Sequence, residues 1–339
     1  MKLFIFEYFA SGMKESHELK KAGYAMLDAV LRDFTRIPEI NIMTIFDYSL
    51  KERVFQDPLA PGLEIFWRKG REDGQKLFEE ILIRCEAVLI IAPETAGILA
   101  ELTALAENRG KIVLGSCSKA LNVTCHKAKL LSLMGKKGLP VPRSDILQKP
   151  LASVAKAQIL EMFSYPLVIK PVCGTGGEGV RLIQTGEQLD KVVEQLATMG
   201  EETFLVQEYI PGQAVSVSLF VLEGKVLPLS LNRQILKDED ELGFRGITVP
   251  YEHSLDQDII KIASAACEQV EGLKGFIGVD LVAGPEGPVL IEINSRITLA
   301  YVALREVVSR NLAGDLLNLC VENRVPPKPE IQGRYTYRL

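Results

Sequence analysis

The sequence lacks the cysteine and histidine patterns that mark zinc sites and disulfide scaffolds. Only three histidines and six cysteines occur in 339 residues, and no two cysteines form a CxxC pair. The cysteines are scattered along the chain, at positions 85, 117, 125, 173, 267 and 320. We therefore expect free thiols, as in a reducing cytoplasm.

Long hydrophobic runs and an excess of positive charge are also missing. No run reaches the roughly 20 apolar residues that a membrane helix needs, and the apolar start MKLFIFEYF is too short for a signal peptide. The net charge of −5 gives no electrostatic reason to expect nucleic acid or an anionic membrane as partner. We predict a cytoplasmic protein with small-molecule partners, and leave a homodimer open.

Three common catalytic or nucleotide-binding signatures are absent as well. No Ser-His-Asp or Cys-His arrangement is visible, so covalent catalysis by a nucleophile is not indicated. No GxGxxG follows the first strand-like run, which makes a dinucleotide site a weak interpretation, and no glycine-rich segment continues into the GK[ST] of a Walker motif.

The first third of the chain instead alternates short apolar runs with amphipathic helical patterns. Such alternation predicts a Rossmann-like parallel sheet with helices on both faces. We assign this α/β unit to residues 1–120. Its predicted strands are 3–6, 40–46, 63–67, 87–92 and 112–115, and its predicted helices are 16–34, 73–84 and 96–108.

Several polar residues are candidates for substrate binding. Glu7, Ser11 and Glu94 follow predicted strands of the N-terminal sheet, and ligands of parallel sheets bind beyond the carboxyl ends of the strands. The alternative is that Ser11 belongs only to a turn and Glu94 only to the first turn of a helix. Arg233 and Arg245 could clamp a substrate carboxylate, since arginine forms bidentate pairs.

The segment 275–298 predicts a metal site. Its sequence, GFIGVDLVAGPEGPVLIEINSRIT, reads as strands at 276–282 and 288–293 around a Gly/Pro turn. Glu292 and Asn294 are two residues apart and share one face of a strand, and a hairpin can bring Asp280 onto that face. Two carboxylates and an amide suit Mg²⁺ or Mn²⁺, and Arg296 could place a fixed positive charge beside phosphates. The alternative is that each acid is a solvated strand-end group.

The middle of the chain adds groups that bind anions. Lys170 ends an apolar strand, and a lysine aimed inward from such a strand needs an anion. The following loop, 172–180, has four glycines in six residues and could cradle phosphates with bare N–H groups; a tight hairpin has the same composition. Lys127 lies near the start of a predicted helix at 124–138, where it is either solvated or a phosphate ligand.

Three motifs follow one another in the chain: VIKP with its glycine loop, then QEYIPG, then GVD…IEINSR. Over about residues 127–298, the sequence resembles the ATP-grasp family of carboxylate–amine and carboxylate–thiol ligases. The resemblance implies an ATP-grasp fold, α/β and α+β, in which two lobes clasp ATP behind a pre-ATP-grasp domain. The small lobe would span 121–212, the large lobe 213–325, and a C-terminal tail 326–339. That tail has little core-forming pattern.

The resemblance also implies roles for individual residues. Lys127 and Lys170 would hold phosphates, and Arg296, Lys170 and Asn294 would be catalytic. Asp280, Glu292 and Asn294 would ligate Mg²⁺. The loop at Gly174, Thr175, Gly176 and Gly177 would close over the phosphates, and the segment Gln207, Glu208, Tyr209 and Ile210 would bind adenine. Two departures from the family pattern are Ala214, where many relatives have a ribose-binding glutamate, and His126, where many have aspartate.

Further stretches, among them FEY…SG, APETAGILAELT, PLSLNRQ and EINSRIT, resemble one branch of the family, the tyramine–glutamate ligases of methanofuran-type cofactor synthesis. This branch implies an amide-forming reaction of L-glutamate with tyramine through an acylphosphate, with release of ADP and phosphate. A ligase with another amino-acid or carbamoyl-phosphate-type substrate, and a catalytically silent nucleotide-binding module, are the alternatives.

Overall fold

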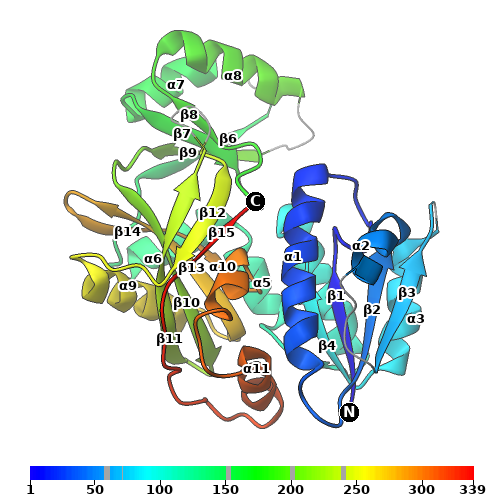
Figure 1. Ribbon diagram of the computed structural model, residues 1–339. Coiled ribbons are helices and arrows are strands. Elements are labelled where there is room, and N and C mark those ends of the chain that lie inside the picture. Colours follow the sequence, from blue (N-terminus) through cyan, green and yellow to red (C-terminus); the bar gives the residue numbers. More distant parts are fainter. Residues whose placement is uncertain (57–61, 71, 150–153, 199–202, 238–241) are drawn as a thin grey trace.

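Three β-sheets with their covering helices make up the described part of the chain (Figure 1). The computed structural model describes residues 1–339 except 57–61, 71, 150–153, 199–202 and 238–241. The N-terminal sheet stands to one side in Figure 1, and the other two sheets lie one above the other beside it.

The N-terminal sheet is parallel, with the strand order β3-β2-β1-β4-β5, as the alternating pattern predicted. Its central strand carries four apolar side chains in a row, Leu3 to Phe6, and all four are fully buried because helices cover both faces. Helix α1 begins where Ser16 caps it by accepting a hydrogen bond from Leu19 N at 3.4 Å. The strands are β1 (Lys2–Glu7), β2 (Asn41–Asp47), β3 (Leu63–Arg68), β4 (Ala87–Ile91) and β5 (Ile112–Val113); the helices are α1 (His17–Phe34), α2 (Lys51–Gln56), α3 (Gly74–Arg84) and α4 (Ile98–Asn108), with 3-10 turns η1 (Tyr48–Leu50) and η2 (Thr95–Gly97).

The small four-stranded sheet is antiparallel, with the order β6-β9-β7-β8. Two helices lead into it, where the sequence predicted one helix at 124–138. The predicted helix corresponds to Lys127–Lys136, which starts later than expected because the ring Nδ1 of His126 accepts a hydrogen bond from Lys129 N at 3.3 Å and caps it. The helix before it, Ser118–Thr124, was not predicted. The elements are α5 (Ser118–Thr124), α6 (Lys127–Lys136), β6 (Ser144–Gln148), α7 (Val154–Met162), β7 (Leu167–Pro171), β8 (Arg181–Ile183), α8 (Gly186–Thr198) and β9 (Thr203–Glu208).

The large sheet has six antiparallel strands in the order β14-β13-β10-β11-β12-β15. Its last strand belongs to the tail, where the sequence shows little core-forming pattern and no strand was predicted. β15 is an edge strand with mostly exposed side chains, and it is held by backbone pairing with β12 and by the half-buried Tyr337, which packs against the core. The elements are β10 (Gln213–Leu222), β11 (Lys225–Leu236), β12 (Phe244–Val249), α9 (Asp256–Glu268), β13 (Lys274–Gly284), β14 (Gly287–Asn294), α10 (Leu299–Leu304), α11 (Leu312–Val321) and β15 (Tyr335–Arg338).

Helix α1 joins the N-terminal sheet to the large sheet. Its inner face shares one apolar core with α10, α11 and the large sheet. A buried ion pair fixes the contact, since Arg305 Nη2 lies 2.7 Å from Asp33 Oδ1 and the hydroxyl of Tyr301 donates to Asp33 Oδ2 at 2.9 Å. A buried pair with an added hydrogen bond fixes geometry well. This contact fixes the last turn of α1 against α10.

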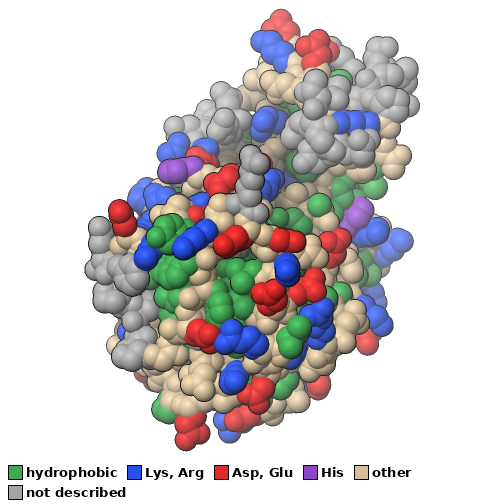
Figure 2. Space-filling model, turned by 90° about the vertical axis from the view of Figure 1, so that its right-hand side faces the viewer, with side chains coloured by type: hydrophobic (Ala, Val, Ile, Leu, Met, Phe, Trp, Pro, Cys, Tyr) green, Lys and Arg blue, Asp and Glu red, His purple; other side chains and the backbone are tan. Residues whose placement is uncertain are grey.

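The outer face of the molecule in Figure 2 mixes Lys and Arg with Asp and Glu, and apolar side chains lie between them. Exposed ion pairs on the N-terminal domain, such as Arg84 with Glu64 at 2.7 Å, fit this mixture and contribute little stability. Among the described helices, none has both the length and the apolar character that crossing a membrane requires.

Candidate active site

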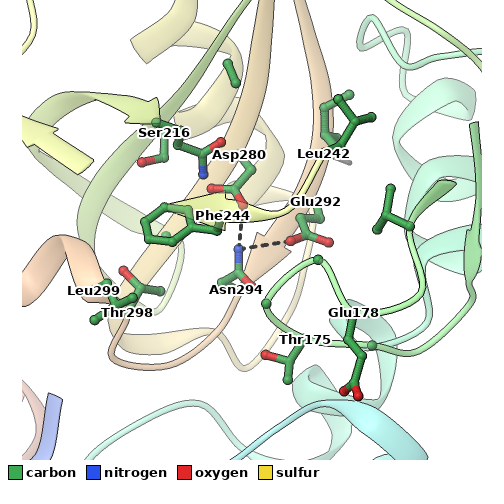
Figure 3. A pocket seen from close by; sticks show the side chains of 18 of the residues that line it. Thr175, Glu178, Ser216, Leu242, Phe244, Asp280, Glu292, Asn294, Thr298 and Leu299 are labelled. Atoms are coloured by element: carbon green, nitrogen blue, oxygen red, sulfur yellow. Dashed lines mark hydrogen bonds between the residues drawn. The ribbon is translucent and has the colours of Figure 1, made fainter. Parts of the chain in front are cut away.

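A cavity of about 310 Å³ opens where the three sheets meet, and Figure 3 shows it from close by. The end of β1 and the first turns of α1 form one wall. The glycine-rich loop and β9 form a second wall, and the hairpin β13–β14 forms the floor. Most residues that the sequence singled out for ATP or metal therefore face one space.

The hairpin places the predicted metal ligands together. Asp280 on β13 stands opposite Glu292 on β14, and Asn294 is the next residue on the same face. The amide Nδ2 of Asn294 donates to Asp280 Oδ2 at 3.0 Å and to Glu292 Oε1 at 3.5 Å (Figure 3). The prediction that these three side chains share one face of a late hairpin is confirmed.

The two carboxylates of this hairpin are held in different protonation states. Burial, followed by the negative charge of Glu292, raises the pKa of Asp280 to about 8. Burial acts in the same direction on Glu292, but the positive charges of Lys127 and Lys170 outweigh it and lower the pKa of Glu292 to about 2. A further positive charge close to the pair would favour the state in which both carboxylates are ionised.

This donor set fits a hard divalent cation. Two carboxylates and an amide offer only oxygen ligands, which Mg²⁺ and Mn²⁺ prefer. Within the described part of the chain, no three His, Cys, Asp or Glu side chains gather as a metal site. The hairpin therefore depends on Asn294 for its third ligand, and the amide would have to turn its oxygen toward the ion.

Two buried lysines lie beside the carboxylates and differ in their partners. Lys127 Nζ lies 3.0 Å from Glu292 Oε2 and donates to Gly174 O at 3.0 Å. Burial opposes its charge, but Glu292 outweighs burial and raises the pKa of Lys127. The ammonium of Lys170 forms no hydrogen bond or ion pair within the residues that the structure describes, and burial lowers its pKa to about 8. Lys170 is thus a buried cation without a directly paired anion among the described residues, and an anionic ligand in the cavity could pair with it.

The glycine-rich loop forms the wall above the carboxylates. Gly176 and Gly177 have φ values of +65° and +77°, a region that side chains other than glycine rarely adopt. A Cβ on Gly177 would also approach Gly243 Cα to 3.3 Å. Thr175 and Glu178 of the same loop are labelled in Figure 3. Its glycines thus allow the loop to pack closely against the segment before β12.

Arg296 connects the glycine-rich loop to the N-terminal sheet. Its guanidinium makes a bidentate pair with Glu94, at 2.8 Å from Nε to Oε1 and 2.9 Å from Nη2 to Oε2. Nη2 also donates to Thr175 Oγ1 at 2.7 Å. Burial opposes the charge, but Glu94 outweighs it and raises the pKa of Arg296. Glu94, predicted as a substrate ligand, instead holds Arg296 and does not line the cavity.

The segment predicted to bind adenine lines the cavity along the edge of β9. Gln207, Glu208, Tyr209 and Ile210 all contribute to the wall. The side chain of Gln207 donates to Ser144 Oγ at 3.0 Å, and Glu208 Oε1 accepts from Arg143 N at 2.7 Å. These bonds tie the segment to β6. Its adenine contact remains a prediction.

Three predicted substrate residues lie away from the cavity, which is a correction. Ser11 is buried, and its hydroxyl donates to Tyr8 O at 2.9 Å, so it stabilises the turn after β1. Arg233 on β11 and Arg245 on β12 are exposed and do not line the cavity. Their neighbours Gln234 and Phe244 face the cavity instead, because successive residues of a strand point to opposite sides.

Several lining residues were not predicted at all. Ser216, Thr298 and Leu299 are labelled in Figure 3 beside the hairpin, together with Phe244. The alternation along β11, which continues to Leu236, is the one local signal for Gln234. For the others we find no sequence signal, since they reach the cavity only through the pairing of distant strands.

The family is decided by comparison with known sequence families. The ATP-grasp domain model matches residues 124–300, and the pre ATP-grasp 3 domain model matches residues 40–121. The chain belongs to the ATP-grasp family. The first match covers just over half of the chain and includes the glycine-rich loop and the whole hairpin. The ATP-grasp fold with an N-terminal parallel-sheet domain is thereby confirmed.

Curated relatives of this ATP-grasp protein include ligases. It is 29% identical over 306 residues to the tyramine–L-glutamate ligase of Methanocaldococcus jannaschii, which covers 89% of this chain and 84% of the relative. It is also similar to an α-L-glutamate ligase of Vibrio vulnificus that is described as probable, at 28% identity over 64% of this chain and 70% of that protein.

A solved ATP-grasp superfamily protein from Archaeoglobus fulgidus resembles the whole structure. It has a TM-score of 0.74 and 26% identity, and the match covers 100% of this chain and 92% of the other. The N-terminal sheet and both lobes are therefore arranged as in that solved structure.

Proposed function

We propose that this protein is an ATP-dependent ligase that joins a carboxylate to an amine through an acylphosphate and releases ADP and phosphate. The best candidates for its substrates are L-glutamate and tyramine, which would give γ-glutamyltyramine. The relative from M. jannaschii carries this activity in its name and matches along most of both chains, which supports the proposal.

In this proposal the substrate carboxylate attacks the γ-phosphorus of ATP, and the acceptor amine then displaces phosphate from the acylphosphate. Such phosphoryl transfer depends on alignment and charge neutralisation more than on covalent help from the protein. Asp280, Glu292 and Asn294 would hold Mg²⁺ or Mn²⁺, which when bound supplies positive charge to the phosphate oxygens. Lys127 and Lys170 would neutralise phosphate charge, and Arg296 would stabilise the transferred phosphoryl group.

The remaining nucleotide contacts would come from backbone. The glycine-rich loop would cover the phosphates with its N–H groups, and residues 207–210 would hold adenine along β9. Arg296 already touches this loop through Thr175 and is held by Glu94 from the N-terminal sheet. This contact supports a role for the N-terminal domain in positioning Arg296.

A single observation carries the proposal. The unpaired, buried ammonium of Lys170 and the two coupled carboxylates face the same cavity, under a loop whose glycines take positive φ values. A silent nucleotide-binding module has no need for this combination, because a buried unpaired charge costs stability.

The test is ADP release by the purified protein with a panel of carboxylates and amines. We expect release to require both substrates and Mg²⁺ or Mn²⁺, and mass spectrometry to find the amide. ADP release without dependence on an acceptor would indicate an ATPase of another kind, and nucleotide binding without turnover would indicate a silent module.

All six cysteines are free in the structure, which supports our prediction of a cytoplasmic site of action.

A further inference from the structure

Glu7 is a buried carboxylate in the cavity that the proposed roles above leave unused. It is the last residue of β1, has 1% of its surface exposed, and lines the cavity. No side chain among the described residues forms a hydrogen bond or ion pair with it, and Oε2 accepts from the backbone N of Ala10 at 2.5 Å. Burial of a carboxylate without a directly paired cation is costly.

Helix α1 leaves room for this carboxylate. A Cβ on Gly23 would lie 2.3 Å from Glu7 Oε2 and 2.6 Å from Oε1, so only glycine fits opposite it. Burial raises the pKa of Glu7 to about 8, against the backbone N–H of Ala10 and the positive charge of Arg296. Arg296, itself paired with Glu94, is the charged side chain whose field acts on Glu7.

The wall around Glu7 is apolar. Phe9, Leu19, Ala22 and Met26 line the cavity on the same side, from the end of β1 and from α1. A lone carboxylate in an apolar wall matches a molecule with one cationic group and an apolar body. Arg296, whose charge acts on Glu7, also donates a hydrogen bond to Thr175 of the glycine-rich loop. The wall around Glu7 therefore borders the end of the cavity where the acylphosphate would form.

We propose that Glu7 binds the ammonium group of the acceptor amine and removes a proton from it before the amine attacks. This inference rests on the proposed ligase function and assigns the apolar wall to a primary amine with an aromatic or aliphatic body. Glu7 takes one proton from the ammonium. The freed nitrogen lone pair forms the C–N bond, and the C–O bond to phosphate breaks with its electron pair on phosphate. The second proton leaves the nitrogen to phosphate or water, and Glu7 returns its proton to solvent.

The test separates acylphosphate formation from amine attack. Hydroxylamine is largely uncharged at neutral pH and traps acylphosphates as hydroxamates, so it needs no base. With ATP, L-glutamate and hydroxylamine, we expect Glu7→Gln to form hydroxamate at the wild-type rate. With tyramine in place of hydroxylamine, we expect kcat to fall at least about 100-fold, the usual contribution of a positioned base.

The pH profile distinguishes a base from a merely structural residue. The loss in Glu7→Gln should shrink as pH approaches about 10, where an alkylammonium loses its proton in solution. The glutamine oxygen can still accept from Ala10 N, so the fold should persist. Gly23→Ala is an independent second variant, because its methyl group displaces the Glu7 carboxylate without removing it, and it should show the same selective loss. Glu101→Gln, on the exposed face of α4, is the control and should behave as wild type.

Two outcomes would overturn the inference. Equal loss of hydroxamate and tyramine product in both variants would make Glu7 a structural residue. Full tyramine ligation by Glu7→Gln at neutral pH would remove Glu7 from the reaction. Failure of the proposed function itself looks different, since the wild-type protein would then form no hydroxamate from L-glutamate.

Discussion

Replacing Lys170 by methionine should make the protein more stable and almost inactive. The ammonium of Lys170 is buried without a hydrogen bond or ion pair from any described residue, and its pKa is lowered from the ordinary 10.5 to about 8. Methionine fills similar space with an apolar, flexible chain. A residue that serves function at the expense of stability gives this pair of opposite effects.

The stability gain can be bounded from the pKa of Lys170. A drop from 10.5 to about 8 means that the charged form costs the fold about 3 kcal/mol relative to the unfolded chain. Part of this gain is offset, because Glu292 loses one nearby positive charge while keeping Lys127 at 3.0 Å. We expect a net gain of about 1–3 kcal/mol, or several degrees in Tm.

The gain should depend on pH with a definite sign. The folded pKa of Lys170 is lower than the unfolded one, so the cost is fully present below about pH 8. It disappears as the pH rises toward 10.5, where the lysine is neutral in both states. The stability difference between Lys170→Met and wild type should therefore shrink over this window.

Thermal unfolding of the nucleotide-free protein and ADP release measure the two effects. Turnover should fall about 10²- to 10³-fold, as when one preorganised charge-stabilising donor is removed. Lys136→Met, an exposed lysine near the end of α6, is the matched control and should change neither quantity. A destabilised Lys170→Met protein, or one with wild-type turnover, would refute the reasoning.

Three further predictions concern the loop, the ion pair and the hairpin. Glu94→Gln should lower stability by about 3 kcal/mol in urea unfolding, since it leaves the buried Arg296 charge without its partner; an unchanged midpoint would contradict this. Gly177→Ala should raise KM for ATP, because φ is +77° and the Cβ meets Gly243, whereas Gly138→Ala, with φ +76° and open space around its Cβ, should cost similar stability without a kinetic effect. Asn294→Ala should abolish turnover with circular dichroism unchanged, and full activity would remove the metal assignment.

Local periodicity carried most of what the sequence could predict. Helix α1, predicted at 16–34 and found at His17–Phe34, follows from its amphipathic pattern, which is a local signal. The hairpin β13–β14 follows from two apolar runs around a Gly/Pro turn, and the spacing of Glu292 and Asn294 fixes their common face. These features depend on neighbouring residues, so one sequence is sufficient to predict them.

Features that depend on distant contacts escaped prediction. β15 is held largely by backbone pairing with β12, which requires little apolar pattern in the tail. Arg233 was expected at the substrate, but it faces solvent and the next residue on β11, Gln234, faces the cavity. Which of two successive strand residues faces the cavity depends on the pairing register of the sheet. The pairing of Glu94 with Arg296 joins residues 202 positions apart, so no spacing rule could connect them.

The fate of a carboxylate oxygen tests the central claim most directly. The protein would be incubated with ATP, Mg²⁺, tyramine and L-glutamate labelled with ¹⁸O in its carboxylates, and the released phosphate analysed by mass spectrometry. Attack of the carboxylate on the γ-phosphorus predicts one ¹⁸O atom in each released phosphate, and ADP as the nucleotide product. Phosphate that carries no label, or release of AMP and pyrophosphate, would contradict the acylphosphate account.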